Sequence, residues 1–278
     1  MRGWKNKLGG WWLMALVLSP SLSSADATSG EPVQLRVGLS TEWRQLAGGG
    51  AGPSKVEQAL VSVVLPPGFD AAREWPVLIV NATSDRGYSS SRALLLAYRA
   101  AAAAAGWVSV AADPEPAVSP DEDLLQLRYV LAHAALAAVK PMWKGADQPR
   151  IAFAGFSGGA KYSGWLAALF RSRGVQVAGV YMAGVNTNAL GEAAKQFGVL
   201  DDVTRAVSVF LQGGTKDKVA TPAQHRDIED DLRVAGFTRV RLELVPGDHV
   251  VNASPLQQAL AWFAQPVPQA TAASAPAR

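Results

Sequence analysis

A serine in the segment 151–170 has the surroundings of a nucleophile. An apolar run at 151–154 is typical of a buried strand, and 161–170 is typical of a helix. Between them lies Gly-Phe-Ser-Gly-Gly, a G-x-S-x-G pattern centred on Ser157. A serine on such a strand-to-helix turn projects its hydroxyl above the sheet edge, and flanking glycines let the helix fold back closely on the strand. The N–H of Gly158 would then face an oxyanion formed on a substrate. The pentapeptide alone also fits a glycine-rich turn without chemistry, but its flanks favour a nucleophile elbow.

A serine hydroxyl is a weak nucleophile and needs an adjacent base. The chain has three histidines. His249 follows the predicted strand 240–245, in the loop that leads to a predicted helix. His133 lies in the middle of a predicted helix and His225 in the first turn of another, so we expect both to be ordinary surface or flank residues. His249 is therefore the predicted base.

An acid is needed to orient the base, and Asp217 has the best local pattern for it. It lies in Gly-Gly-Thr-Lys-Asp-Lys-Val (213–219), between a predicted strand and a predicted helix start. Asp201 or Asp202, after the preceding strand, could serve instead. Because the carboxyl ends of parallel strands meet at one edge of a sheet, Asp217 and His249 are expected beside Ser157.

The elements that must position these residues alternate along the chain. Two strands come first, at 33–39 and 58–65, and later strands are predicted at 75–80, 107–112, 151–154, 175–182, 207–212 and 240–245. Helices are predicted at 90–105, from a capping box at 119–122 to about 139, at 161–170, 189–197, 222–234 and 255–264. Two further capping boxes, at 221–224 and 254–257, open the last two helices. This alternation predicts an α/β fold whose sheet of about eight strands is doubly wound and mostly parallel, with an antiparallel N-terminal edge.

At this point the sequence resembles the α/β-hydrolase family, in which the order of the triad is Ser, Asp, His. The resemblance covers roughly residues 33–264, with Leu-Pro-Pro-Gly-Phe-Asp (65–70) and Trp-Pro-Val-Leu-Ile-Val (75–80) similar to the opening of secreted esterases. The polyhydroxybutyrate-depolymerase-like and feruloyl-esterase-like groups are the most similar. The resemblance implies Ser157 as nucleophile, His249 as general base and then acid, and Asp217 as its orienting carboxylate.

The oxyanion hole is where the chain departs from this family. The family usually has His-Gly after the third strand, where this chain has Asn81-Ala82. Besides Gly158, the second donor is expected to be the backbone N–H of Thr83, or else that of Ala82. No large lid is expected, because the longest candidate insertion, about 184–205, is too short for a cap domain. An open site favours small or solvent-exposed esters.

The N-terminus has the pattern of an export signal. Three basic residues precede an apolar run at 9–18, and Ala-Asp-Ala (25–27) is a small-x-small cleavage site. The domain prediction is a signal peptide at 1–27, a flexible leader at 28–32, the hydrolase domain at 33–264 and a disordered tail at 265–278. The apolar run is too short to span a bilayer, so we expect no membrane insertion after cleavage, although a retained anchor is the alternative. The protein is expected to be periplasmic or secreted.

Composition limits the partners. The formal net charge is +3; removal of residues 1–27 takes away three basic residues and one acid and leaves +1. That balance gives no electrostatic reason to expect nucleic acid. The chain has no cysteine, no cluster at metal-ligand spacing and no dinucleotide or Walker pattern, so no metal or cofactor is predicted.

The predicted function is an exported, cofactor-free serine hydrolase that acts on a small-molecule carboxylic ester through an acyl-enzyme. A secreted peptidase or thioesterase with the same machinery is the close alternative. A non-catalytic binding module of the same fold is the alternative from another class. The sequence indicates no oligomeric state.

Overall fold

The computed structural model describes residues 32–266. The predicted signal peptide at 1–27, nearly all of the leader at 28–32 and nearly all of the tail at 265–278 lie outside the described residues.

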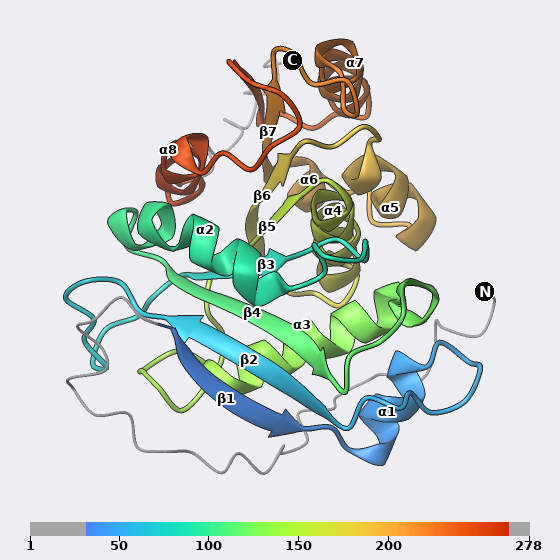
Figure 1. The fold of residues 1–278 in the computed structure, drawn as a ribbon. Coiled ribbons are helices and arrows are strands. Elements are labelled where there is room, and N and C mark those ends of the chain that lie inside the picture. Colours follow the sequence, from blue (N-terminus) through green and yellow to red (C-terminus); the bar gives the residue numbers. More distant parts are fainter. Residues whose placement is uncertain (1–31, 267–278) are drawn as a thin grey trace, which may run out of the picture.

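One eight-stranded sheet forms the centre of the molecule (Figure 1). Its strand order is β1-β2-β4-β3-β5-β6-β7-β8. The strands are β1 (Val33–Gly38), β2 (Gln58–Val64), β3 (Val77–Asn81), β4 (Val108–Glu115), β5 (Ile151–Phe156), β6 (Val177–Ala183), β7 (Ser208–Gly214) and β8 (Val240–Val245). β2 is antiparallel to both β1 and β4, and every pairing from β4 to β8 is parallel. The predicted fold class, strand number and antiparallel edge are therefore confirmed.

Helices cover both faces of the sheet (Figure 1). The helices are α1 (Thr41–Ala47), α2 (Ser91–Ala104), α3 (Leu125–Val139), α4 (Gly158–Arg171), α5 (Ala189–Phe197), α6 (Asp202–Arg205), α7 (Pro222–Val234) and α8 (Ser254–Phe263), with a 3₁₀ turn, η2 (Pro120–Glu122). α2 and α8 bury leucines and aromatic rings against one face, around Tyr98 and Tyr181. The larger core on the other face contains α3 and α4, with Phe153 and Phe170 in ring contact at 5.2 Å. The alternating chain therefore buries both faces of the central strands, which explains their continuous apolar runs.

The helix predicted from the capping box at 119–122 begins later than expected. The capping box forms, but it opens only η2. Asp123 then leaves the helical conformation, at φ −81° and ψ 70°, and α3 begins at Leu125. The reason is a buried ion pair, because the Asp123 carboxylate turns inward to pair with Arg128.

The capping box predicted at 254–257 is also wrong, whereas the one at 221–224 forms. Ser254 is the first residue of α8, not its cap, and its N–H donates to Asn252 Oδ1 at 2.9 Å. The Asn252 side chain, two residues before the helix, thus satisfies the N–H of the first helical residue. The pattern also missed two short helices, α1 and α6. The side chain of Ser40 caps α1, and that of Asp201 caps α6.

Candidate active site

The turn between β5 and α4 places Ser157 at the carboxyl edge of the sheet. Its backbone has φ 55° and ψ −120°, and it is the one non-glycine residue with positive φ among residues 32–266. L-residues adopt that region at a cost, and such strain is concentrated at functional sites. The glycines on each side are sterically required: a Cβ on Gly155 would lie 2.1 Å from the carbonyl oxygen of Gly159, and one on Gly159 would lie 2.1 Å from that of Asn81.

The imidazole of His249 lies between a hydroxyl and a carboxylate. His249 Nε2 is 3.1 Å from Ser157 Oγ, and Nδ1 is 2.7 Å from Asp217 Oδ2. With Nδ1 protonated and donating to the carboxylate, Nε2 is left as the acceptor for the serine proton. The structure thus brings together three side chains that come from the loops after β5, β7 and β8.

Asp217 is held as a carboxylate by its own loop. It is 3% exposed, and Oδ1 accepts hydrogen bonds from the N–H groups of Val219 and Ala220, both at 2.8 Å. Burial acts to raise the pKa of this carboxyl, but the hydrogen bonds from Ala220, His249 and Val219 together outweigh it and leave the pKa below its ordinary value. The acid is therefore negatively charged at neutral pH and fixes the orientation of the ring.

The other acids that the sequence left open lie elsewhere. Asp201 Oδ1 caps α6 by accepting from the N–H of Thr204, and Asp202 lies 3.5 Å from Arg205 on the surface. His249 bonds to Asp217 and to neither of these.

The expectation that His133 and His225 are surface or flank residues is wrong. His225 is fully buried, with Nδ1 3.0 Å from the carbonyl oxygen of Thr221 and its ring against Gly213. His133 stacks on Phe170, with ring centroids 4.7 Å apart, and burial lowers its pKa to about 4. His225 thus lies against β7, whereas the half-buried His133 lies among aromatic rings of neighbouring helices.

The two residues expected to form the oxyanion hole, Gly158 and Thr83, lie against each other. A Cβ on Gly158 would lie 2.3 Å from Thr83 Oγ1 and 3.4 Å from Thr83 Cα, so the start of α4 touches the loop after β3. Thr83 is buried, and its N–H makes no hydrogen bond to any group in residues 32–266. Ala82, the other expected donor, is already used, because its N–H donates to Ser91 Oγ at 3.3 Å. Gly158 and Thr83 are therefore the pair that can receive an oxyanion.

Phe156 and Asn81 are neighbours of the site to which the sequence assigned no role. The Phe156 ring packs on His249 with centroids 4.7 Å apart. Asn81, in place of the family's histidine, donates from Nδ2 to Ser163 Oγ at 3.2 Å and so ties β3 to α4. The position of Phe156 inside the G-x-S-x-G pattern was an available signal for its contact with the base.

Within residues 32–266 there is no group of three or more His, Cys, Asp or Glu residues that could hold a metal ion. In the same part of the chain, no helix is long and apolar enough to cross a membrane.

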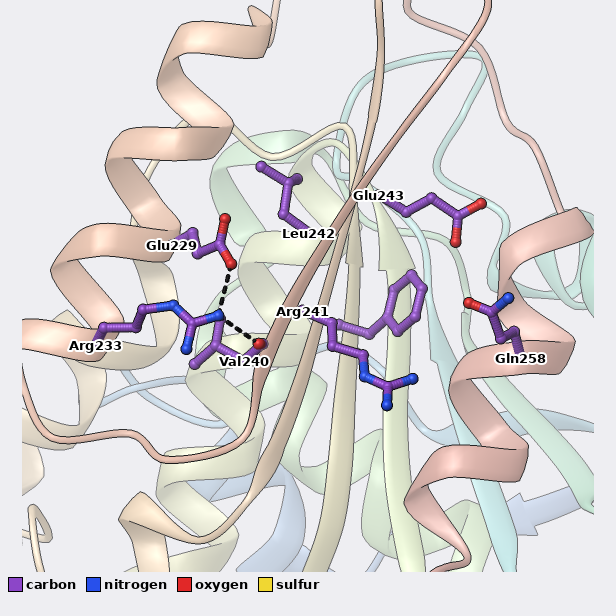
Figure 2. Close-up of a pocket in the computed structure, with 8 residues that line it drawn as sticks. Glu229, Arg233, Val240, Arg241, Leu242, Glu243 and Gln258 are labelled. Carbon is purple, nitrogen blue, oxygen red and sulfur yellow. Dashed lines mark hydrogen bonds and ion pairs between the residues drawn. The ribbon is translucent and has the colours of Figure 1, made fainter.

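A hollow of about 300 Å³ lies along the edge strand β8, between α7 and α8 (Figure 2). Its walls carry charged side chains, two of which pair with each other. Arg233 Nη2 donates to Glu229 Oε1 and to the carbonyl oxygen of Val240, each at 2.8 Å. None of the candidate site residues lines it. The chemistry therefore belongs to the carboxyl edge of the sheet, and this hollow is separate from it.

No family model matches the sequence, and no curated protein matches it. Among solved structures, a variant of the esterase rPPE aligns with a TM-score of 0.58 at 14% identity, over 84% of this chain and 83% of that one. An α/β serine hydrolase without a lid from Xanthomonas campestris aligns with a TM-score of 0.55 at 17% identity, over 88% of this chain and 96% of that one. A serine hydrolase homologue from Coxiella burnetii gives a TM-score of 0.53 at 17% identity, over 75% of this chain and 92% of that one. Together with the sheet order, these similarities show that the chain has the α/β-hydrolase fold, without a large lid in the part described.

Proposed function

We propose that this protein is a serine hydrolase that cleaves carboxylic esters through a covalent acyl-enzyme. The observation that carries the proposal is the continuous chain of contacts from Ser157 Oγ through His249 to Asp217. Solved esterases and α/β serine hydrolases of the same fold support the reaction class. A fold hosts many functions, so the side-chain geometry carries the argument and the fold agrees with it.

In the proposed reaction, Ser157 Oγ attacks the ester carbonyl carbon while His249 Nε2 takes its proton. The carbonyl oxygen becomes an oxyanion and accepts hydrogen bonds from the N–H groups of Gly158 and Thr83. Collapse of this intermediate breaks the bond to the alcohol, which leaves with the proton from His249. Water then attacks the acyl-enzyme by the same route, with His249 again taking and returning the proton. Asp217 stays ionised and stabilises the imidazolium in both halves.

The open edge suits a small or exposed ester. Between β6 and β7 the chain forms only α5 and α6, and α5 packs on α4, with Trp165 and Phe197 in edge-to-face contact at 5.8 Å. Export completes the proposal: residues 1–27 act as a signal peptide, and the enzyme works in the periplasm or outside the cell. Its substrates would then resemble those of the polyhydroxybutyrate-depolymerase-like or feruloyl-esterase-like groups.

An active-site probe tests the reaction class. Fluorophosphonate should label wild-type protein at one serine and should not label Ser157→Ala. Ser172→Ala is the matched control, because this serine ends the same helix, where its hydroxyl bonds to Leu169, and it should be labelled like wild type. Absence of labelling in folded wild-type protein would favour a non-catalytic binding module.

A substrate panel separates the hydrolase classes. Short acyl esters, aryl esters, thioesters and aminoacyl peptides should be compared at equal enzyme concentration. Faster turnover of esters than of peptides supports the proposal, whereas a preference for peptides would assign the same site to a peptidase.

A further inference from the structure

A buried arginine lies next to the candidate oxyanion hole and takes no part in the chemistry proposed above. Arg128 is 3% exposed and is the one formally charged residue between Leu124 and Val139 in an otherwise apolar segment. Its Nε donates to Asp123 Oδ1 at 2.6 Å and its Nη2 to Oδ2 at 2.5 Å, and Asp123 is itself buried. A forked pair of this kind fixes the plane of the guanidinium.

The remaining donors of this guanidinium reach the segment that carries the Thr83 N–H. Nη1 donates to Ser91 Oγ at 3.1 Å, and Nη2 donates to the carbonyl oxygen of Thr83 at 3.5 Å. Ser91 Oγ in turn accepts from the N–H of Ala82. The Thr83 N–H belongs to the peptide group between Ala82 and Thr83. The peptide group before it is linked to Arg128 through Ser91, and the peptide group after it is bonded to Arg128 directly.

The same network holds the helix that follows the nucleophile. Tyr162, on α4, donates from its hydroxyl to the carbonyl oxygen of Asp123 at 2.6 Å. Its ring lies against the guanidinium, with Arg128 Cζ 5.0 Å from the ring centroid. The two candidate donors, Gly158 on α4 and Thr83 after β3, are thus positioned by one set of side chains.

Stability alone does not account for such a pair. Burying two charges costs most of what their attraction returns, so buried ion pairs are weak contributors to stability. A backbone donor is useful only when its nitrogen lies about 2.7–3.1 Å from the position that the oxyanion will occupy. We propose that Arg128 is a positioning residue for the oxyanion hole: with Asp123, Ser91 and Tyr162 it holds the Thr83 N–H against the start of α4. This proposal rests on the proposed function.

The first test removes the pair without leaving a buried charge. Asp123→Leu/Arg128→Met should keep the fold and lower kcat by about tenfold to a hundredfold, since loss of a whole donor costs about 10² to 10³. KM should stay within about twofold, because the donors act on the transition state more than on the bound ester. The matched control is Arg239→Met: Arg239 also bonds a serine hydroxyl and a backbone carbonyl, those of Ser208 on β7 and Trp262 on α8. Its kcat should not change.

A second variant covers the case in which the double variant does not fold. Ser91→Ala leaves the ion pair intact and removes only the link to the Ala82 N–H. It should lower kcat by several-fold with little change in KM. Wild-type kcat in Ser91→Ala and in the folded double variant would overturn the proposal.

An NMR readout separates this proposal from the proposed function. In protein labelled with ¹⁵N-threonine, the amide signal of Thr83 is assigned by its absence from the spectrum of Thr83→Ser. This signal should shift or broaden in Ser91→Ala and in the double variant but not in Arg239→Met. This measurement needs no turnover. If wild type hydrolyses nothing, the proposed function fails while the amide still reports on positioning. An unchanged Thr83 signal in both variants would show that Arg128 does not hold the loop.

Discussion

Ser157, His249 and Asp217 each depend on other groups of the site. The serine hydroxyl needs the strained turn to reach the ring, the ring needs the carboxylate to fix its tautomer, and the carboxylate needs two backbone N–H groups to stay ionised in a buried position. The three contributions are therefore expected to act as a unit, and their losses should not add.

Substitution of the base separates it from the buried histidine nearby. His249→Ala should lower kcat by roughly 10⁶ and Asp217→Asn by about 10⁴, because one removes the proton acceptor and the other spoils its orientation. His225→Ala should retain turnover but lose stability, since it empties a fully buried position. Steady-state kinetics and thermal denaturation check both effects. Near-normal turnover in folded His249→Ala would end the assignment.

The Thr83 donor can be tested through its backbone. Thr83→Pro removes the N–H. The transition state should then lose about 3 kcal/mol of stabilisation, which is measured as a lower kcat. Thr83→Ala keeps the N–H and should change kcat little, although its hydroxyl bond to Asp85, at 2.9 Å, is lost. Equal activity in wild type and in folded Thr83→Pro would mean that the second donor lies elsewhere.

At the scale of elements, the joint between β5, α4 and β3 depends on close backbone approach. Gly155→Ala would place a Cβ 2.1 Å from the carbonyl oxygen of Gly159, and no flexible side chain is available to yield. We expect a loss of stability of about 3 kcal/mol or more. Gly38→Ala is the matched control, because nothing lies within 4 Å of its Cβ position. Denaturant melts that give the two variants equal midpoints would contradict the packing argument.

Helix α3 contributes acid sensitivity through His133. Burial lowers the pKa of this ring to about 4, whereas an unfolded histidine titrates near 6.5. Between these values the unfolded chain binds a proton that the folded chain does not. The stabilisation is thus fully present above about pH 6.5 and is lost as pH falls toward 4, by roughly 3 kcal/mol.

His133→Leu should flatten this dependence, because the apolar side chain keeps the contacts with Phe170 and Tyr129 without a titrating nitrogen. Urea unfolding between pH 7 and pH 4 measures the difference between variant and wild type. If the free energy of unfolding falls equally with pH in the two proteins, His133 is not the source of the acid sensitivity.

At the scale of the whole molecule, export is the remaining proposal. Protein recovered from the periplasm or medium of an expressing cell should begin after Ala27 or slightly earlier. Ala25→Arg/Ala27→Arg should block processing, because the cleavage site requires small side chains. Mass spectrometry of the N-terminus decides the outcome, and exported wild-type protein that still begins at Met1 would contradict the proposal.

Much of the architecture follows from local pattern. Apolar runs and alternation predict the strands because strand burial has a period that is visible in sequence, and the order of strands and helices restricts the sheet to a few topologies. The turn at Ser157 is equally local, since only glycine tolerates the approach of β5 and α4.

The rest was decided by contacts that form only when the chain packs. Ser157 and His249 are 92 residues apart, and only the parallel sheet brings their loops to one edge. Thr83 rather than Ala82 is the candidate donor because the Ala82 N–H already donates to Ser91 Oγ. The true start of α3 depends on Asp123 turning toward Arg128 rather than continuing the helix. Hydrogen bonds of this kind are chosen by which polar groups are buried together, and that is a property of the packed chain and not of any one segment.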